Sequence, residues 1–272
     1  MIKGVRILNF DDSVVYQKNF VKLFDPVVVD LKHLNRSARL WAFDNIAKAV
    51  SGALKPSQHN ALTFIGSSDY HHVSGILLKQ YLQPVTVIVF DHRPDWSVVG
   101  PKLACNSWVS GQVGLVNIVN VLEFGVGKDA MQTPWRFAGN FRSVKGGRLK
   151  LYGHYPMPLL PKIIKNIYTD DVYISLDKSC LKKEENLSNW EEGRMSLDLV
   201  LAIIKMIGKE KNIVGMDVAG EYSMPTYDHV FKNVFASIAR PRDYTARDKK
   251  MPQIDEVNES TNIRIATALL AK

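Results

Sequence analysis

Short runs of β-branched and aromatic residues recur along the chain and are separated by more polar segments. Runs of this length and composition predict buried strands. Several of them are almost continuously apolar, which is typical of strands covered on both faces of a sheet. The predicted strands are Val5–Asn9, Val27–Asp30, Leu62–Gly66, Val85–Asp91, Val116–Leu122, Leu149–Tyr152, Val172–Asp177 and Ile213–Val218.

Between several of these strands, apolar residues recur at helical spacing. Ser196 precedes one such segment as an N-cap, with Asp198 in the first turn. Alternation of strands and helices favours an α/β fold with three layers (α/β/α) and a central, mostly parallel sheet. No repeat or low-complexity linker divides the chain, so we expect one domain over residues 1–272. The predicted helices are Asn35–Leu54, His71–Leu82, Ser196–Ile207, Tyr227–Ala239 and Asn262–Ala271.

The composition fits an ordinary globular protein, with 46% hydrophobic and 23% charged residues in 272. The stretch Met1–Phe10 resembles a strand rather than a secretory signal, and no apolar run approaches the roughly 20 residues of a membrane span. Cys105 and Cys180 are too few for a disulfide framework. These features predict a cytoplasmic protein with no membrane partner.

The net charge of +8 raises the question of nucleic-acid binding. The densest basic cluster is Arg240–Lys250, but Asp243 and Asp248 interrupt it. Such a mixture favours solvated surface over a phosphate-binding patch. Nucleic acid is therefore not an expected partner.

Acidic residues stand where three of the predicted strands end. Asp91 and Asp95 follow one strand, Asp177 ends another, and Asp217 and Glu221 follow a third. Because ligands of open α/β sheets bind at the carboxyl ends of the strands, these carboxylates are expected to meet at one rim. Their mutual repulsion requires a bound cation or a basic side chain among them.

His71, in the segment Gly66–His72, adds a nitrogen donor after another strand. One histidine with several carboxylates suits manganese, zinc or iron(II) as a water activator. The alternatives are a structural histidine at a helix start and a purely ionic cluster around Arg93.

Four segments in this order resemble the ureohydrolase family of arginases, agmatinases and deacetylases. Further short motifs resemble a bacterial branch of arginase-like proteins of uncertain function. The resemblance implies an arginase-like fold and spans about residues 62 to 225. The segments are Gly66–His72, Asp91–Asp95, Ser175–Ser179 and Gly215–Glu221, and the further motifs are Pro94–Trp96, Cys105–Trp108 and Asn189–Gly193.

The resemblance also implies a metal site. The family holds two metals, and at two positions of the second-metal ligands this chain has Arg93 and Ser179. Arginine does not give up its proton and cannot ligate. We therefore expect one divalent metal per chain, manganese before zinc or iron, with the Arg93 guanidinium neutralising the acids in place of the second. The residues that match the ligands of the first metal are His71, Asp91, Asp95 and Asp177, although Tyr70 separates His71 from Asp69 where the family has none.

In relatives, acids of the last segment hold a cationic group of the substrate, so Asp217 and Glu221 are candidates for that role together with Arg93 in the site. Pairing with surface lysines is the alternative, and Glu221 stands four residues after Asp217 where the family has three. His92 is expected to point away from Arg93 and to pack, because neighbouring side chains on a strand face opposite sides. The alternative is a bulge at the strand end, which would let His92 ligate the metal.

Two further residues have structural interpretations. Asp69 is expected to cap the helix near His71. Cys105 lies near a proton-shuttling histidine of relatives, but we expect a plain buried cysteine, because no base accompanies it in the sequence.

Two functions from different classes follow. The first is a hydrolase of a non-peptide C–N bond in a guanidino, imino or amide group, acting on a small and cationic substrate with one metal-activated water. The second is a non-catalytic binding protein on an arginase-like scaffold, in which Arg93 replaces the second metal. A homo-oligomer is expected only by analogy with relatives.

Overall fold

The computed structural model describes residues 2–55, 60–96, 101, 103–128, 144, 146–239 and 251–270. Within them the chain forms one eight-stranded sheet, in which every neighbouring pair of strands is parallel. The strand order is β2-β1-β3-β8-β7-β4-β5-β6. The strands are β1 Val5–Asn9, β2 Val27–Asp30, β3 Leu62–Ser67, β4 Val85–Phe90, β5 Ile118–Phe124, β6 Leu149–Tyr152, β7 Asp171–Asp177 and β8 Asn212–Glu221.

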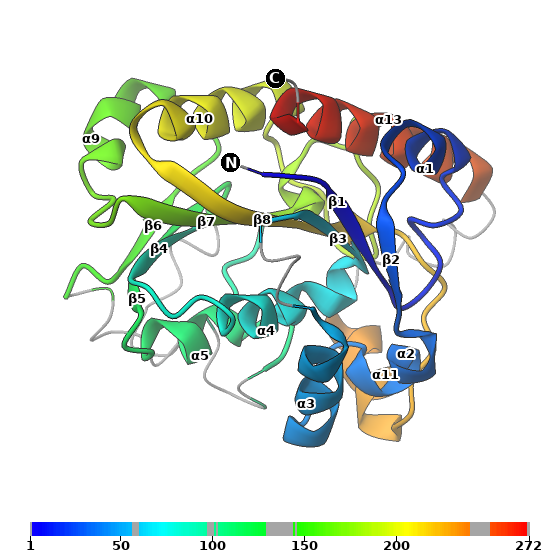
Figure 1. Ribbon diagram of the computed structural model, residues 1–272. Coiled ribbons are helices and arrows are strands. Elements are labelled where there is room, and N and C mark those ends of the chain that lie inside the picture. Colours follow the sequence, from blue (N-terminus) through cyan, green and yellow to red (C-terminus); the bar gives the residue numbers. More distant parts are fainter. Residues whose placement is uncertain are drawn as a thin grey trace.

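Helices cover both faces of this sheet (Figure 1) and confirm the predicted three layers. One face carries α1 Lys18–Phe24, α9 Leu160–Ile164, α10 Leu197–Glu210 and α13 Met251–Leu270, and the other carries α2 Asn35–Ala38, α3 Asp44–Ala53, α4 Ser74–Leu78, α5 Trp108–Val113 and α11 Val230–Ala239. Short 3-10 turns complete the layers at η1 Lys32–Leu34, η3 Ser68–Val73, η4 Met157–Leu159 and η5 Lys178–Cys180.

Each face of the sheet has its own hydrophobic core. Along β4, Ile88 and Phe90 belong to the core under α10, and Val87 and Val89 belong to the core under α4 and α5. Every residue of this strand is buried. The continuous apolar pattern of the sequence therefore reflects a strand that is covered on both sides.

The strand order brings distant segments together at the centre of the sheet. β3 and β4 follow one another in the sequence, but β8 and β7 lie between them in the sheet. The first three strands thus form one side of the sheet, and β4 begins the other side. A crevice forms outside the carboxyl ends at such a reversal, and ligands of open α/β sheets bind there.

Some predicted elements differ in extent. The helix expected over Asn35–Leu54 is two helices, α2 and α3, because Leu40 takes a left-handed φ of 69°. Its backbone pairs instead with its surroundings: Leu40 N–H donates to the Asp69 carbonyl, and Cys105 N–H donates to the Leu40 carbonyl. The helix expected over His71–Leu82 is shorter and begins as η3. The predicted cap of α10 is confirmed, since Ser196 Oγ accepts from Leu199 N–H.

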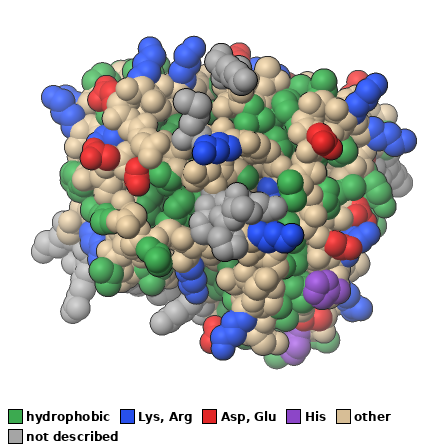
Figure 2. All heavy atoms as spheres, in the orientation of Figure 1, with side chains coloured by type: hydrophobic (Ala, Val, Ile, Leu, Met, Phe, Trp, Pro, Cys, Tyr) green, Lys and Arg blue, Asp and Glu red, His purple; other side chains and the backbone are tan. Residues whose placement is uncertain are grey.

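No helix within the described residues is long and apolar enough to cross a membrane. The basic cluster Arg240–Lys250 lies outside the described residues. On the face shown in Figure 2, lysine and arginine side chains are dispersed among acidic ones rather than gathered in one patch.

Candidate metal centre

A bend at the end of β3 places His71 over the sheet. Gly66 has a φ of 95° at an irregularity in the pairing of β3 with β8. A side chain there would be strained, and its Cβ would come within 2.8 Å of Asp11 Oδ1. Directly after it, Ser67 Oγ accepts from Asp69 N–H and starts η3, which carries His71.

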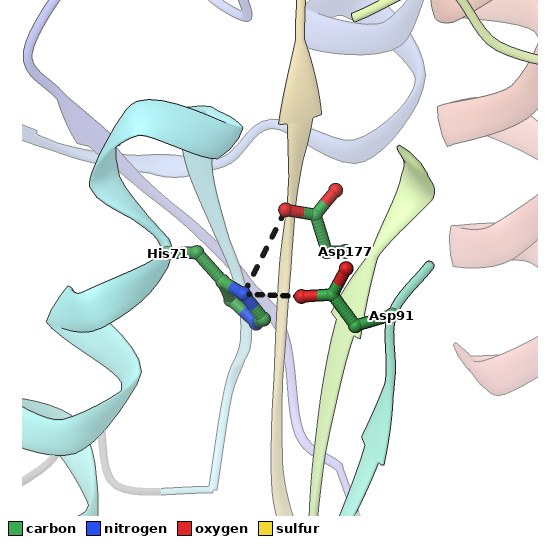
Figure 3. A group of neighbouring side chains, drawn as sticks. All are labelled: His71, Asp91 and Asp177. Atoms are coloured by element: carbon green, nitrogen blue, oxygen red, sulfur yellow. Dashed lines mark ion pairs between the residues drawn. The ribbon is translucent and has the colours of Figure 1, made fainter. Parts of the chain in front are cut away.

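The acidic ends of β4 and β7 lie opposite His71 (Figure 3). The pairing of Phe90 with Leu176 sets Asp91 beside Asp177. His71 Nδ1 lies 3.1 Å from Asp91 Oδ2, 2.8 Å from Asp95 Oδ2 and 3.6 Å from Asp177 Oδ2. One ligand atom from each of His71, Asp91 and Asp177 falls within 4.8 Å of the other two. The structure thus brings the four predicted metal-ligating residues together.

Hydroxyl groups and Asp217 hold the opposite edge of the His71 ring. His71 Nε2 lies 2.9 Å from Ser175 Oγ, which donates to Asp217 Oδ1 at 2.8 Å. Tyr173 also donates to this carboxylate, from its hydroxyl to Oδ2 at 2.6 Å. Because Ser175 donates its one hydroxyl proton to Asp217, the Ser175 oxygen accepts a hydrogen bond from His71 Nε2–H. The network therefore uses Nε2 for the Ser175 contact and directs Nδ1 at the three carboxylates, so Nδ1 is the ring atom that a metal would meet.

The outer oxygens of two of these carboxylates accept hydrogen bonds from neutral donors. Asp91 Oδ1 accepts from Arg93 N–H at 3.0 Å and from Ser179 Oγ at 3.2 Å. Asp177 Oδ1 accepts from Ser179 N–H at 2.7 Å and from Ser68 Oγ at 2.9 Å. The Oδ2 atoms of these two residues face His71. Ser179 thus bridges the two acids through its amide and its hydroxyl.

Asp95 is fixed by an aromatic donor. Trp108 Nε1–H donates to Asp95 Oδ2 at 2.6 Å, and the Trp108 ring packs edge-on against His71 with ring centroids 5.1 Å apart. Trp108 is fully buried as the first residue of α5. The same side chain therefore orients one acid and supports the imidazole.

The cluster carries an excess of buried negative charge. Burial and the charge of Asp91 raise the pKa of Asp95 well above its ordinary value and that of Asp177 to about 6. Burial alone would lower the pKa of His71, but hydrogen bonds with Asp91 and Asp95 raise it well above the ordinary value. These shifts mean that the acids favour any cation held among them. The donor set of one imidazole and three carboxylates fits a divalent metal of intermediate hardness.

A cavity of about 220 Å³ opens above these acids. Its volume suits a small reacting group. Its apolar wall includes Cys105, which is 8% exposed, together with Trp190 and Phe235. The residues that line it are Ser68, Asp91, His92, Arg93, Asp95, Cys105, Asn106, Asp177, Ser179, Trp190, Glu191 and Phe235.

Arg93 does not place its charge as we expected. Its guanidinium forms an ion pair with Glu191 Oε2 at 2.5 Å, and both side chains are about half exposed. Its contact with Asp91 Oδ1 is made by the backbone N–H. An ion pair at the cavity mouth loses less hydration than a guanidinium buried among the acids, which explains the outward direction.

Asp217 and Glu221 also lie elsewhere than we expected, because neither lines the cavity. Asp217 stands behind His71 and is fully buried. Glu221 forms a buried ion pair with Lys178 and accepts from Gln17 Nε2 at 3.0 Å and from Asn262 Nδ2 at 2.7 Å. A carboxylate with its hydrogen bonds already made inside the protein has no free face for a substrate.

Two further expectations need correction or refinement. Ser67 caps η3, whereas Asp69 forms a buried ion pair with Arg39 at 2.9 Å. His92 stacks on His154 with ring centroids 5.7 Å apart, although it also lines the cavity.

Sequence reasoning missed the supporting role of Ser175. The sequence spacing contains a signal for this role: Tyr173, Ser175 and Asp177 stand at every second position and therefore share one face of β7. A polar residue within a buried strand requires a hydrogen-bond partner on that face. The same signal applies to Glu123, a fully buried acid on β5.

No known family profile matches the chain. A sequence relative, an uncharacterized protein of Thermotoga maritima, is 29% identical over 165 residues. The match spans 60% of this chain and 59% of that relative, less than two thirds of its length.

Solved structures share the fold over most or all of the chain. Arginase from Bacillus subtilis superposes with a TM-score of 0.61 at 13% identity and 99% coverage of both chains. Entamoeba histolytica arginase in complex with L-ornithine gives 0.58 at 14% identity, covering 88% of this chain and 97% of that one. Trypanosoma cruzi formiminoglutamase with Mn²⁺ gives 0.52 at 13% identity, covering 80% and 83%. The protein therefore has the ureohydrolase fold, the three-layer α/β/α architecture of arginases and formiminoglutamases.

Proposed function

We propose that the protein is a metal-dependent hydrolase of a non-peptide C–N bond, in a guanidino, imino or amide group of a small molecule. The observation that carries this proposal is the direction of His71 Nδ1 toward three carboxylates at the floor of a cavity. The site lies at the carboxyl ends of central strands, where open α/β sheets bind ligands. The arginase and formiminoglutamase neighbours support the same reaction class.

We propose one divalent metal per chain, held by His71, Asp91, Asp95 and Asp177, with manganese first. The structure of the formiminoglutamase neighbour contains Mn²⁺, which supports that choice of ion. A bound metal supplies a Lewis acid that lowers the pKa of water to about 7. The outer oxygens of Asp91 and Asp177 already accept hydrogen bonds from Ser179, which supports one metal rather than two.

The chain's own residues hold and orient this centre. Asp217 acts through Ser175 to keep the His71 ring in place, and is a positioning residue rather than a substrate ligand. Glu221 acts through Lys178, the residue next to Asp177. Of Asp217, Glu221 and Arg93, Arg93 is the residue that can touch a substrate, because it lines the cavity beside Glu191.

We further propose that the protein works in the cytoplasm and that a homo-oligomer is its assembled form. The buried free thiols of Cys105 and Cys180 support a reducing compartment. The homo-oligomer is proposed by analogy with arginase-like relatives.

A second candidate function is a non-catalytic binding protein. The raised pKa of His71 favours it, because a protonated imidazole between Asp91 and Asp95 would partly neutralise the acids without a metal. The two candidates differ in metal content, which can be measured directly.

Elemental analysis after manganese loading and dialysis separates them. We expect about one metal ion per chain in the native protein, as for a single open catalytic site. Asp177→Ala should reduce the content to near zero, because it removes a ligand and a carboxylate charge. Asp170→Ala is the matched control: Asp170 is exposed at the opposite end of β7 and should leave the content unchanged.

Each other outcome is informative. Two ions per chain would contradict the single-metal site. No metal in the loaded native protein would exclude the hydrolase and leave the binding protein.

A further inference from the structure

A second cleft adjoins the cavity of the metal centre. It has a volume of about 610 Å³ and is built by loops that follow β4, β5, β6 and η5. Both hollows are lined by His92, Arg93 and Glu191, so they meet at the Arg93–Glu191 ion pair. The cleft therefore continues the ligand-binding rim of the sheet toward its β6 edge. Its remaining lining residues are Pro94, Trp96, Gly127, Lys128, His154, Glu192 and Arg194.

Among the described residues that line this cleft, positive charge exceeds negative charge. Arg93 and Glu191 neutralise each other, which leaves Lys128 and Arg194 facing the single carboxylate of Glu192. Neither Lys128 nor Arg194 forms an ion pair with another described residue. Both side chains are exposed and free to turn toward a ligand.

His154 adds a polar group to the same lining. Its ring stacks on His92, and its buried Nδ1 has no hydrogen-bond partner among the described residues. Burial lowers the pKa of His154, and the positive charges of Arg194 and Lys128 lower it further. Lys128, Arg194 and His154 line the same cleft, where an anion would be attracted by the two cations and would accept a hydrogen bond from the neutral imidazole.

We propose that this cleft binds an anionic group, a carboxylate or a phosphate, carried by the substrate whose C–N bond is cleaved in the adjoining cavity. Lys128 and Arg194 supply the charge, and His154 supplies a ring nitrogen. The Arg93–Glu191 pair stands at the boundary and separates the reacting end from the anionic end. This inference rests on the proposed hydrolase for the word substrate, but the anion-binding site itself can be tested without it.

The direct test is calorimetric titration of the full chain, at low and at physiological salt, with inorganic phosphate and with succinate. Succinamide, which is similar in shape but uncharged, is the control ligand. We expect at least one anion to bind at millimolar concentration or better and succinamide not to bind. The stronger of the two anions identifies the group, phosphate or carboxylate.

The variant Lys128→Ala/Arg194→Ala should weaken anion binding about tenfold or more, because it removes two charge-assisted contacts. Lys205→Ala/Lys209→Ala is the matched control: both lysines are exposed on α10, outside the lining of either hollow, and the net charge changes equally. Equal weakening in both variants, or no binding to the native protein, would overturn the proposal.

Metal content measured on the same samples keeps the two hypotheses apart. The Lys128/Arg194 variant should retain its metal, because these residues lie outside the metal centre. Anion binding without metal would refute the hydrolase and leave the anion cleft standing. Metal binding without anion binding would refute the anion cleft and leave the hydrolase standing.

Discussion

Ser175 shows how one small side chain orients a candidate metal ligand, His71. Its hydroxyl lies between His71 Nε2 and Asp217 Oδ1, at 2.9 and 2.8 Å. A metal-ligating histidine commonly donates its other ring N–H to such a partner, which fixes the tautomer and the ring orientation. Without that partner, the His71 ring could rotate or take up its proton on Nδ1.

Ser175→Ala tests this role. We expect manganese affinity to fall about 10- to 100-fold, as for other partners that orient metal ligands. The stoichiometry at saturating metal should remain near one, since no ligand is removed. Titration calorimetry measures both quantities. The control is Ser237→Ala, on exposed helix α11, whose hydroxyl bonds within its own helix; unchanged affinity in both variants would contradict the positioning role.

Glu123 is a second polar residue in a buried strand, and its position is costly. It is fully buried on β5, and neither carboxylate oxygen has a hydrogen-bond partner among the described residues. Burial raises the pKa of Glu123 well above its ordinary value, and the charges of Asp95 and Asp91 raise it further. The folded protein therefore holds a proton there that the unfolded chain releases.

This linkage has a definite sign. With a pKa that is higher in the folded state, the stabilising effect of protonation is complete below the unfolded pKa of about 4.3 and is lost as the pH rises toward the folded pKa. In Glu123→Gln this dependence is absent. The free energy of unfolding of the native protein should thus fall relative to the variant, by up to about 1.4 kcal/mol per pH unit. Urea unfolding from pH 5 to 8 measures it.

Glu210→Gln, at the exposed end of α10, is the control for this pH series. It should run parallel to the native protein. A constant difference between Glu123→Gln and the native protein at every pH would mean that Glu123 has the same pKa in both states.

At the scale of elements, a buried ion pair joins the ends of β7 and β8 to two helices. Lys178 follows β7, and its ammonium contacts Glu221 at the end of β8. Glu221 also accepts from Gln17, the residue before α1, and from Asn262 on α13. Burial lowers the pKa of Lys178, and Glu221 partly offsets this effect. The pair therefore connects β7, the strand that carries Asp177, to the helix layer of α1 and α13.

Breaking this pair on one side should be more harmful than removing both charges. Lys178→Met alone leaves a buried carboxylate and should lower the free energy of unfolding by about 3 to 5 kcal/mol. Lys178→Met combined with Glu221→Gln should lower it by less than the sum of the single changes. Chemical unfolding of the four proteins in this double-mutant cycle gives the coupling energy.

The surface pair Lys211–Asp170, 3.9 Å apart, in which Asp170 is exposed and Lys211 half-buried, is the comparison. Its cycle should give a coupling below about 1 kcal/mol. Additive effects of Lys178 and Glu221 would show that the contact contributes no more than this surface pair.

The sequence predicted those features that follow from local pattern. Continuous apolar runs marked the strands, and parallel strands required Asp91 and Asp177 to meet at one rim. It did not predict where long side chains turn. Arg93 pairs with Glu191, 98 positions away, and Gln17 reaches Glu221 across 204 positions. Such partners depend on tertiary packing, which hydrophobic periodicity does not encode.

At the scale of the whole molecule, the proposed metal centre forms only when the sheet is complete. His71 follows β3, Asp91 and Asp95 follow β4, and Asp177 ends β7. β4 and β7 are neighbours in the sheet, although β5 and β6 separate them along the chain. An unfolded chain therefore has no preformed site, and metal binding is coupled to the stability of the entire fold.

Manganese should consequently raise the thermal unfolding temperature of the native protein. A ligand that binds only the folded state stabilises it by about 2.7 kcal/mol at a concentration of 100 times its Kd. For a chain of this size, that energy corresponds to an increase of about 5 to 10 °C. Calorimetric scans with manganese and with a chelator measure it. Asp177→Ala should show no increase, whereas Asp170→Ala should behave like the native protein. An equal increase in all three proteins would mean that the metal binds elsewhere, because the proposed site requires Asp177 at the end of β7.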